Sequence, residues 1–354
     1  MLCLRNKLLR HGGNVKEFII SDKEANQRFD KYLAKVLNKA PKSFIYKMLR
    51  KKNIVLNNKK SDGSEKICKG DSVKIYLSDE TFDSFSENKN KLTLRELPKN
   101  KISKKEIIYE NNDVLLFNKP VGMLSQKAKN TDISANEYLI QYLLDTNQLT
   151  EIELSTFKPS VCNRLDRNTS GILIFGKTIN GLQEMSSLLR DRTMHKFYLC
   201  IVNGVVKEKK NITGYLIKDE KTNRVTIIKK PIIPDDKSNY IETEYLPICN
   251  NGKYTLLKVL LVTGKTHQIR AHLASIGFPL VGDCKYGNQK CNEYFKNKYH
   301  LKHQLLHSYE LNFSETYSKI EELNGNCYFA APPELFNKIL TGEKLKWEHG
   351  TAVD

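Results

Sequence analysis

The stretch Arg164-Leu165-Asp166-Arg167-Asn168-Thr169-Ser170-Gly171 stands directly before the apolar run Ile172-Leu173-Ile174-Phe175. The apolar run predicts a buried strand, and the small residues before it predict a turn. A lone Arg-x-Asp pattern would be weak evidence of function, because exposed ion pairs of this kind are common and contribute little to stability. Three charges at the entrance to a buried strand are more specific. They make Arg164, Asp166 and Arg167 candidate functional residues.

The length and composition of the chain indicate a soluble protein with two domains. At 354 residues, either domain could bury a core of its own. Apolar residues make up 40% and charged residues 28% of the chain. No apolar run approaches the roughly 20 residues that cross a bilayer, and the segment from Met1 to Arg10 has too short an apolar core for a secretory signal. We therefore expect a cytoplasmic location and no membrane partner.

The charge of the chain points to a polyanionic partner. The 58 basic and 40 acidic residues give a formal net charge of +18 at pH 7. Nucleic acid is the natural partner of such a chain, ahead of an anionic membrane, and a solvated lysine-rich surface is the alternative. The eight cysteines contain no CxxC pair and match no zinc-finger spacing. We expect reduced thiols, no disulfide and no metal site.

Residues 26–77 form a basic unit, the core of a predicted N-terminal domain over residues 1–80. The apolar residues of 29–37 recur at the spacing of one helix face, and those of 44–49, after Pro41, predict a second short helix. Strands are expected at 54–56 and 73–77. From residue 28 to residue 74 there are 14 basic and 4 acidic residues, so a net charge of +10 is concentrated here.

The remainder of the chain predicts a linker and a second, larger domain. Residues 81–105 are polar and lack an apolar period, which is typical of a linker. Over residues 106–354 we expect strands at 114–117, 172–175, 197–202, 241–246 and 254–262, and helices at about 134–145, 179–190 and 266–276. This mixture favours an α+β domain around a mixed or antiparallel sheet, preceded by the small α/β unit.

Several motifs of the larger domain, six segments in all, resemble those of one enzyme family. The stretch around Asp166 resembles the RLDxxTSG signature of the RluA-type pseudouridine synthases, which isomerise uridine in RNA. The other matching segments, in the order of the family, are 118–122 (NKPVG), 196–199 (KFYL), 264–274 (GKTHQIRAHLA) and 282–287 (GDCKYG), followed by 306–308 (LHS). The resemblance spans about residues 106–335 and implies a pseudouridine synthase catalytic domain. One departure is Asn163, where many relatives carry His or Tyr.

The chemistry of this family assigns roles to three residues. Uridine must be detached at its N-glycosidic bond, rotated and rejoined through carbon 5, and the first step calls for a carboxylate beside the sugar. Asp166 would act as nucleophile or as base. It is the only acid that stands between two arginines at the entrance to a predicted buried strand. The resemblance implies that Arg270 pairs with it and that Tyr198 stacks on the target base and takes the carbon-5 proton. A surface ion pair for Arg270 and a core ring for Tyr198 are the plainer alternatives.

RNA contacts are expected at two places. A base within folded RNA must leave its stack to reach a carboxylate, and the family's equivalent of Arg164 fills the vacated place or holds a phosphate. The basic unit resembles the S-four-like RNA-binding domain, which implies phosphate contacts from its second helix. A solvated lysine face is the alternative there. The candidate contacts are Arg164, Arg167, Lys42, Lys47, Arg50, Lys51 and Lys52.

Three functions remain to be compared. The first is an RNA pseudouridine synthase that needs no cofactor, acting on large-subunit ribosomal RNA or on transfer RNA. The second is a non-catalytic RNA-binding or ribosome-assembly protein on the same fold, which would not need all of Asp166, Tyr198 and Arg270. The third is an N-glycosidase, which would release free uracil. The domain arrangement favours the first function with ribosomal RNA as substrate, and we expect a monomer.

Overall fold

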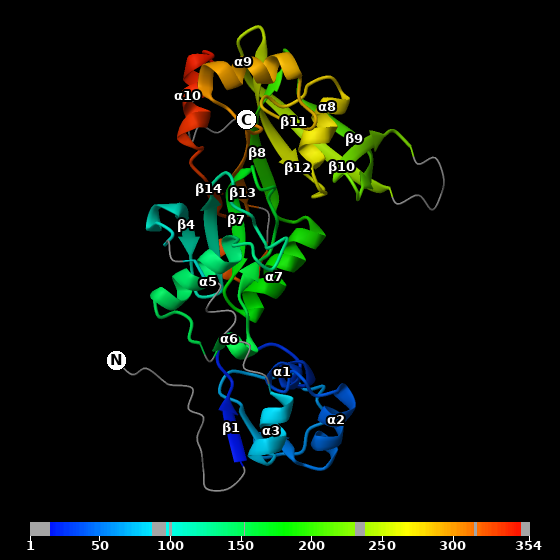
Figure 1. Cartoon of the computed structure of the whole chain (residues 1–354), viewed down its shortest axis with the longest axis vertical. Coiled ribbons are helices and arrows are strands. Elements are labelled where there is room, and N and C mark those ends of the chain that lie inside the picture. The colour runs from blue at the N-terminus through cyan, green and yellow to red at the C-terminus, as the bar shows by residue number, and fades with distance from the viewer. Residues whose placement is uncertain are drawn as a thin grey trace.

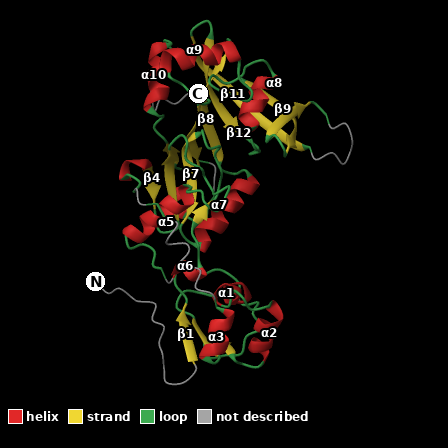
Figure 2. Cartoon of the chain, viewed as in Figure 1, coloured by secondary structure: helices red, strands yellow, loops and turns green. Residues whose placement is uncertain are grey.

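The computed structural model describes residues 15–86, 97–98, 101–151, 153–230, 238–314 and 317–347. These residues form a small N-terminal unit and a larger part that follow one another along the long axis of the molecule (Figure 1). The larger part has the predicted α+β architecture, in which helices lie against a mixed sheet (Figure 2). Within the described residues, no helix is both long and apolar enough to cross a membrane.

The small unit combines an antiparallel sheet with helices on it. Its strands lie in the order β1 (Val15–Ile19), β3 (Ser72–Tyr76) and β2 (Ile54–Leu56). The two helices expected from apolar spacing are α1 (Phe29–Val36) and α2 (Lys42–Arg50). Strand β1 lies before the predicted unit and completes its sheet. The unit has a separate apolar core that includes Phe29, Leu33, Leu37, Ile45, Leu49, Ile54 and Ile75.

A helix begins where the sequence predicted the end of the first domain and a linker. Helix α3 (Asp79–Phe85) starts after Ser78, whose hydroxyl caps it. Phe82 and Phe85 pack against the core of the small unit. Two aromatic residues in a polar segment are too few to produce a periodic signal, which is why the sequence pattern missed this helix. Positions 87–96 and 99–100 of the expected linker lie outside the described residues.

The larger part is built on one sheet, which has eleven strands within the described residues. Its main path is β10 (Arg224–Ile228), β9 (Lys210–Asp219), β11 (Asn239–Asn250), β12 (Tyr254–Leu261), β8 (His195–Asn203), β13 (Leu306–Asn312), β7 (Ser170–Gly176), β5 (Val114–Lys119) and β4 (Ile107–Glu110). Two short strands, β14 (Cys327–Phe329) and β6 (Ser160–Val161), pair with β13 and β7. The pairing of β13 with β7 is parallel, whereas the other described pairs along this path are antiparallel.

The helices of the larger part include the three that apolar spacing predicted. These are α5 (Ala135–Asp145), α7 (Ile179–Asp191) and α8 (Gln268–Ser275). The sequence did not predict α6 (Glu153–Thr156), α9 (Gln289–Tyr299), α10 (Glu334–Gly342), η1 (Lys104–Glu106) or η2 (Glu321–Leu323). Helix α9 is rich in polar residues and buries a single narrow stripe of Cys291, Phe295 and Tyr299, so its apolar signal is weak.

The small unit contacts the larger part through buried polar groups. Lys23 Nζ lies 2.9 Å from Glu153 Oε1 on α6, and the backbone N–H of Ile179 donates to the carbonyl of Lys23 at 3.1 Å. The hydroxyl of Thr156 donates to Glu24, and both side chains are buried. Because buried polar groups need their partners, these contacts favour one orientation of the small unit over a loose tether.

The centre of the sheet depends on one glycine. Gly171 has φ of +105°, and strand β13 approaches it so closely that a Cβ there would lie 2.1 Å from the carbonyl oxygen of Ser308. The parallel register pairs Ser308 with Gly171 at this point. Strand β7, which follows the Asp166 turn, can therefore join β13 only if this position has no side chain.

We expect Gly171→Ala to lower the free energy of unfolding by about 3 kcal/mol or more, because the backbone strain and the clash add. Urea unfolding followed by circular dichroism measures this loss. Gly252→Ala is the matched control: Gly252 has φ of +82° but nothing within 4 Å of its Cβ position, so only the backbone strain applies. Equal losses in the two variants would contradict the importance of the close approach.

Candidate active site

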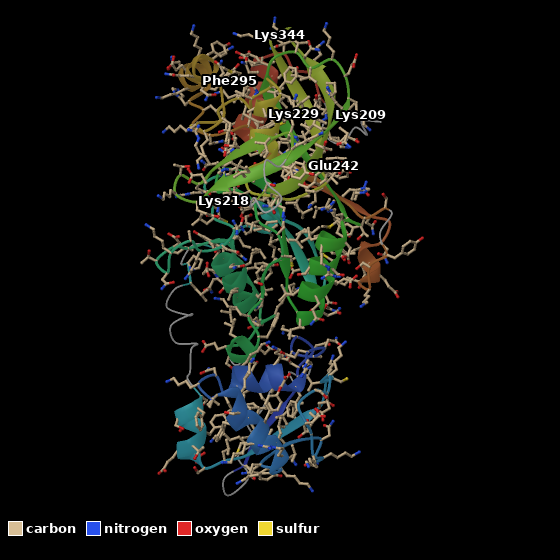
Figure 3. All side chains as sticks on the ribbon, turned by 90° about the vertical axis from the view of Figure 1, so that its right-hand side faces the viewer. Lys209, Lys218, Lys229, Glu242, Phe295 and Lys344 are labelled. Carbon is tan, nitrogen blue, oxygen red and sulfur yellow. The ribbon has the colours of Figure 1, made fainter. Side chains whose placement is uncertain are left out.

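A cleft of about 1120 Å³ brings together five of the residues that the sequence predicted. Asp166, Arg164 and Arg167 come from the turn before β7, Tyr198 from β8 and Arg270 from α8, and all of them line this cleft. Lys218 on β9 also lines it and is labelled in Figure 3, which views the molecule from the side where α7 lies in Figure 1. Three segments far apart in the sequence thus meet at the predicted site.

The turn that carries Asp166 is held in place by residues 119–125. The N–H of Thr169 donates to the carbonyl of Asp166 at 2.9 Å and closes the turn. Ser125 Oγ donates to the carbonyl of Leu165 at 2.9 Å and accepts from its N–H at 3.0 Å. The N–H of Gly122 donates to the carbonyl of Arg167 at 2.9 Å. The backbone on both sides of Asp166 is therefore fixed.

Lys119 is a buried cation beneath this turn. Its ammonium group donates to the carbonyls of Pro120, Met123 and Arg167 at 3.0, 2.9 and 3.2 Å, and its side chain is fully buried. Burial lowers the pKa of Lys119 to about 7, against the opposing effect of the nearby Asp166 carboxylate. Lys119 therefore connects the NKPVG segment to the Asp166 turn. The sequence motif alone did not predict this role.

Arg270 lies between two carboxylates. Its Nη1 donates to Asp166 Oδ2 at 2.8 Å, as the resemblance implied. Its Nε and Nη2 donate to the two oxygens of Asp283 at 2.7 and 2.9 Å, which is a bidentate pair. Arg270 is only 6% exposed and Asp283 only 1% exposed. The guanidinium therefore has little freedom, and the direction of Nη1 toward Asp166 is set by Asp283.

Asp166 is not the only carboxylate that bonds to Arg270. Burial alone would raise the pKa of Asp283, but the hydrogen bonds and charge of Arg270, with two backbone N–H donors, bring it below its usual value. Asp166 differs, because 26% of its side chain is exposed to the cleft. One carboxylate is thus a buried support and the other is open to a ligand. The position of Asp283 within the GDCKYG motif was the signal available in the sequence.

Tyr198 lies both in the core and at the cleft. It is 5% exposed and packs in the apolar cluster that also contains Leu165 and Ile269, yet it lines the cleft that contains Asp166. Burial raises the pKa of its phenol to about 12, with a lowering effect from a hydrogen bond to Ser308 and a raising effect from the Asp166 charge. The phenol is therefore protonated at neutral pH.

Arg164 and Arg167 are both exposed at the cleft but differ in what they contact. Arg167 Nε donates to the carbonyl of Gly122 at 3.1 Å, so part of its guanidinium is used within the protein. Arg164 remains open to a ligand in the cleft. The neighbouring Asn163 accepts a hydrogen bond from the N–H of Ile174 at 2.8 Å, which gives this departure from the family pattern a structural role.

The basic residues predicted on the second helix do not reach this cleft. Lys42, Lys47 and Arg50 on α2, with Lys51 and Lys52 after it, are all exposed on the small unit. Helix α2 lies near the opposite end of the molecule from α8 (Figure 1). Among the described residues, no group of three or more His, Cys, Asp or Glu side chains is arranged to hold a metal ion.

The comparisons with known proteins agree with this fold. The family described as RNA pseudouridylate synthase matches residues 113–275. The chain is 32% identical over 295 residues to the ribosomal large subunit pseudouridine synthase C of Buchnera aphidicola subsp. Baizongia pistaciae, which covers 83% of this chain and 88% of the relative. It therefore belongs to the RNA pseudouridine synthases, which are isomerases.

Two further matches agree with this result, one in sequence and one in fold alone. The protein of the same name from Haemophilus influenzae is 29% identical over 306 residues, covering 85% of this chain and 87% of the relative. The solved structure of human RNA pseudouridylate synthase domain containing 4 aligns with a TM-score of 0.54 over 72% of this chain and 96% of that chain. Its sequence identity is 17%, so this second match concerns the fold alone.

We expect Asp283→Asn to cost about 3–5 kcal/mol of stability at pH 7, because it leaves the buried Arg270 without its main counter-charge. The lowered pKa of Asp283 stabilises the folded state above the ordinary value of about 3.9, and this contribution is lost as the pH falls below that value. The difference in the free energy of unfolding between wild type and variant should therefore become smaller in acid. Urea unfolding at pH 7 and near pH 3 measures it.

Asp166→Asn is the matched control for that measurement. It removes the partly exposed partner of Arg270 and keeps the buried one, so it should cost less than about 1 kcal/mol. Comparable losses in the two variants would show that Asp283 has no special supporting role.

Proposed function

We propose that this enzyme converts uridine to pseudouridine in large-subunit ribosomal RNA. The named substrate of the Buchnera and Haemophilus relatives supports ribosomal RNA over transfer RNA. The observation that carries the chemical part is the Asp166 carboxylate, open to a cleft and bonded to Arg270. Pseudouridine mapping in ribosomal and transfer RNA, with and without the gene, tests the target. Loss of sites from transfer RNA alone would contradict the proposal.

Asp166 is the group that we propose acts at the sugar. The bond between N1 of uracil and C1′ of ribose breaks, the base turns, and C5 bonds to C1′, while the C5 proton is lost and N1 gains one. The reaction conserves the mass of the substrate and needs no oxidant or reductant. A carboxylate serves as nucleophile or as base in this step. The hydrogen bond from Arg270 orients it.

Tyr198 is the proposed acceptor of the C5 proton. Its ring lies at the cleft among apolar side chains, where a flat base could stack on it. With a pKa of about 12, the phenol can accept the C5 proton only in its small phenolate fraction, formed by loss of its own proton to solvent, and the hydrogen bond to Ser308 favours that phenolate. The resulting phenolate would be a strong base in a site shielded from water.

The RNA is proposed to contact two surfaces. Arg164 is exposed beside Asp166, where it could occupy the place of a base that has left its stack. The exposed cations of α2 and its C-terminal end would bind phosphates of the same RNA at a distance. The contacts of the partly exposed Lys23 and the buried Glu24 with α6 support a defined spacing between these surfaces. We propose that the small unit positions RNA and that the larger part performs the chemistry.

Asp166→Asn should abolish isomerisation and leave RNA affinity within about twofold. The amide keeps the shape of the carboxylate but has neither its charge nor its nucleophilic oxygen. Tritium release from RNA labelled at C5 of uridine measures turnover, and free uracil is measured in the same samples. Near-native tritium release by the variant would exclude the role of Asp166. Uracil release by the wild type without pseudouridine would favour hydrolysis over isomerisation.

Tyr198→Phe should keep RNA binding and fail to complete the reaction, because the ring remains and the proton acceptor is lost. In the wild type, the phenolate fraction rises about tenfold for each pH unit below 12, so tritium release should become faster from pH 6 to pH 9. The variant should lack this rise. Unchanged product formation in the variant would mean that the ring only packs.

Neutralising the α2 surface should weaken RNA binding without affecting the chemical step. The variant changes Lys42, Lys47, Arg50, Lys51 and Lys52 to Gln. The slope of log affinity against log salt should fall by up to about 4 if all five contact phosphates. The control changes Lys290, Lys296, Lys338, Lys344 and Lys346 to Gln, exposed residues on or beside α9 and α10 at the other end of the molecule (Figure 1). Identical slopes for the two variants would make the α2 face a solvated surface only.

A further inference from the structure

His267 stands beside Asp166 and belongs to a short chain of hydrogen-bonding groups. Its Nε2 lies 3.9 Å from Asp166 Oδ2, and its Nδ1 lies 3.0 Å from the hydroxyl oxygen of Tyr286. That hydroxyl oxygen accepts a hydrogen bond from the N–H of Val225 on β10 at 2.9 Å. The side chain of His267 is 8% exposed and lines the cleft.

The carboxylate that faces Nε2 favours one tautomer of His267, because a bare ring nitrogen there would point its lone pair at a negatively charged oxygen. The Tyr286 oxygen accepts from the backbone N–H of Val225, and this bond leaves the hydroxyl proton available for His267. In this tautomer, Nδ1 accepts the hydrogen bond from the Tyr286 hydroxyl. A neutral imidazole carries a single N–H, which is then on Nε2. That N–H faces Asp166 Oδ2. A hydrogen-bond donor is thus directed at the candidate catalytic carboxylate.

The groups around His267 keep the ring neutral. Burial lowers its pKa most; Asp166 and Asp283 raise it, and Arg270 and Lys285 lower it, with a net result below the ordinary value. At neutral pH the ring therefore offers a single N–H. Protonation at lower pH would put a second proton on Nδ1 and oppose the bond from Tyr286.

The backbone of His267 has an unusual conformation, which also bears on the position of its side chain. His267 precedes the first turn of α8 with φ of +53°, the left-handed region that few residues other than glycine adopt. A residue at this position commonly caps its helix with its side chain, but His267 makes no such bond. Its imidazole is instead engaged with Tyr286 and directed toward Asp166. The strained backbone and the unused capping position both favour a role in the cleft.

Tyr286 supports both donors that face Asp166. Its hydroxyl bonds to His267, and the guanidinium of Arg270 lies over its ring at 5.4 Å from the centroid. Arg224 of β10 lies 5.9 Å from the same ring. A single side chain therefore positions the imidazole and contacts the guanidinium, and it connects them to the β9–β10 hairpin.

We propose that His267 is a positioning residue for Asp166, whose Nε2–H joins Arg270 in holding Oδ2 so that Oδ1 is the reacting oxygen. The inference rests on the proposed function of Asp166. Both donors approach Oδ2 rather than Oδ1, and 26% of the Asp166 side chain is exposed. The distance of 3.9 Å exceeds a hydrogen bond in the free protein, and a closure of about 1 Å on RNA binding would form one.

The test replaces His267 with glycine, which tolerates the left-handed backbone. Free imidazole is then added to the solution to take the place of the missing side-chain ring. Single-turnover pseudouridine formation is measured with enzyme in excess over a labelled RNA. Loss of a hydrogen bond to a charged group should slow the chemical step by about 10- to 100-fold and leave RNA affinity within about twofold. Imidazole should restore the rate, whereas 1-methylimidazole, which cannot both accept from Tyr286 and donate to Asp166, should not.

The matched control is His300→Gly. His300 follows α9 with φ of +57° and is exposed, so it repeats the backbone change away from the cleft. This control should react at the wild-type rate, and added imidazole should not change that rate. Tyr286→Phe provides a second variant if His267→Gly does not fold. It keeps the ring under Arg270, removes the bond that fixes the tautomer, and should slow the chemical step at unchanged RNA affinity.

The possible outcomes separate this inference from the proposed function. A slow His267→Gly enzyme that imidazole alone restores supports the inference. An unchanged rate, equal rescue by 1-methylimidazole, or no rescue by either compound overturns it while the wild type remains active. A wild type that forms no pseudouridine in any ribosomal or transfer RNA would instead overturn the proposed function.

Discussion

The bidentate bond between Arg270 and Asp283 is the interaction on which the candidate active site depends. Two of the guanidinium nitrogens are held by a carboxylate with no exposed surface, and the third faces Asp166. A buried arginine with one counter-ion would become unpaired whenever that counter-ion reacted or took up a proton, and an unpaired buried charge is costly. Asp283 removes this difficulty because it balances Arg270 throughout. Asp166 can then gain and lose charge without disturbing the arrangement around it.

The rest of the site is positioned by backbone constraints more than by side-chain contacts. Ser125, Gly122 and Lys119 bond to main-chain atoms of the Asp166 turn, so the turn has little freedom. On its other side, Gly171 admits strand β13 at a distance that no other residue allows. Preorganisation of this kind means that the reacting groups need little rearrangement when RNA arrives, which is the usual source of electrostatic catalysis in enzymes.

Much of this arrangement could be predicted from local sequence, and the remainder depends on contacts that local sequence does not encode. The buried strand after Asp166 and helices α1, α2, α5, α7 and α8 followed from apolar periodicity, and family motifs anticipated the pairing of Arg270 with Asp166. Asp283 and Lys119 were visible within motifs, but their burial and partners arise only when distant segments meet. Helices α3 and α9 were missed because polar residues outnumber the few that they bury.

The central place of β13 in the sheet also governs the order in which the protein can be completed during synthesis. Strand β13 (Leu306–Asn312) lies between β7 and β8, although β7 ends at Gly176 and β8 at Asn203, far earlier in the chain. Until residue 312 has been made, the two halves of the sheet that carry Asp166 and Tyr198 have no strand to join them. The small unit, by contrast, has all of its strands by Tyr76 and its own core. A growing chain therefore acquires its basic α2 face long before its cleft, since domains fold as units from the N-terminus.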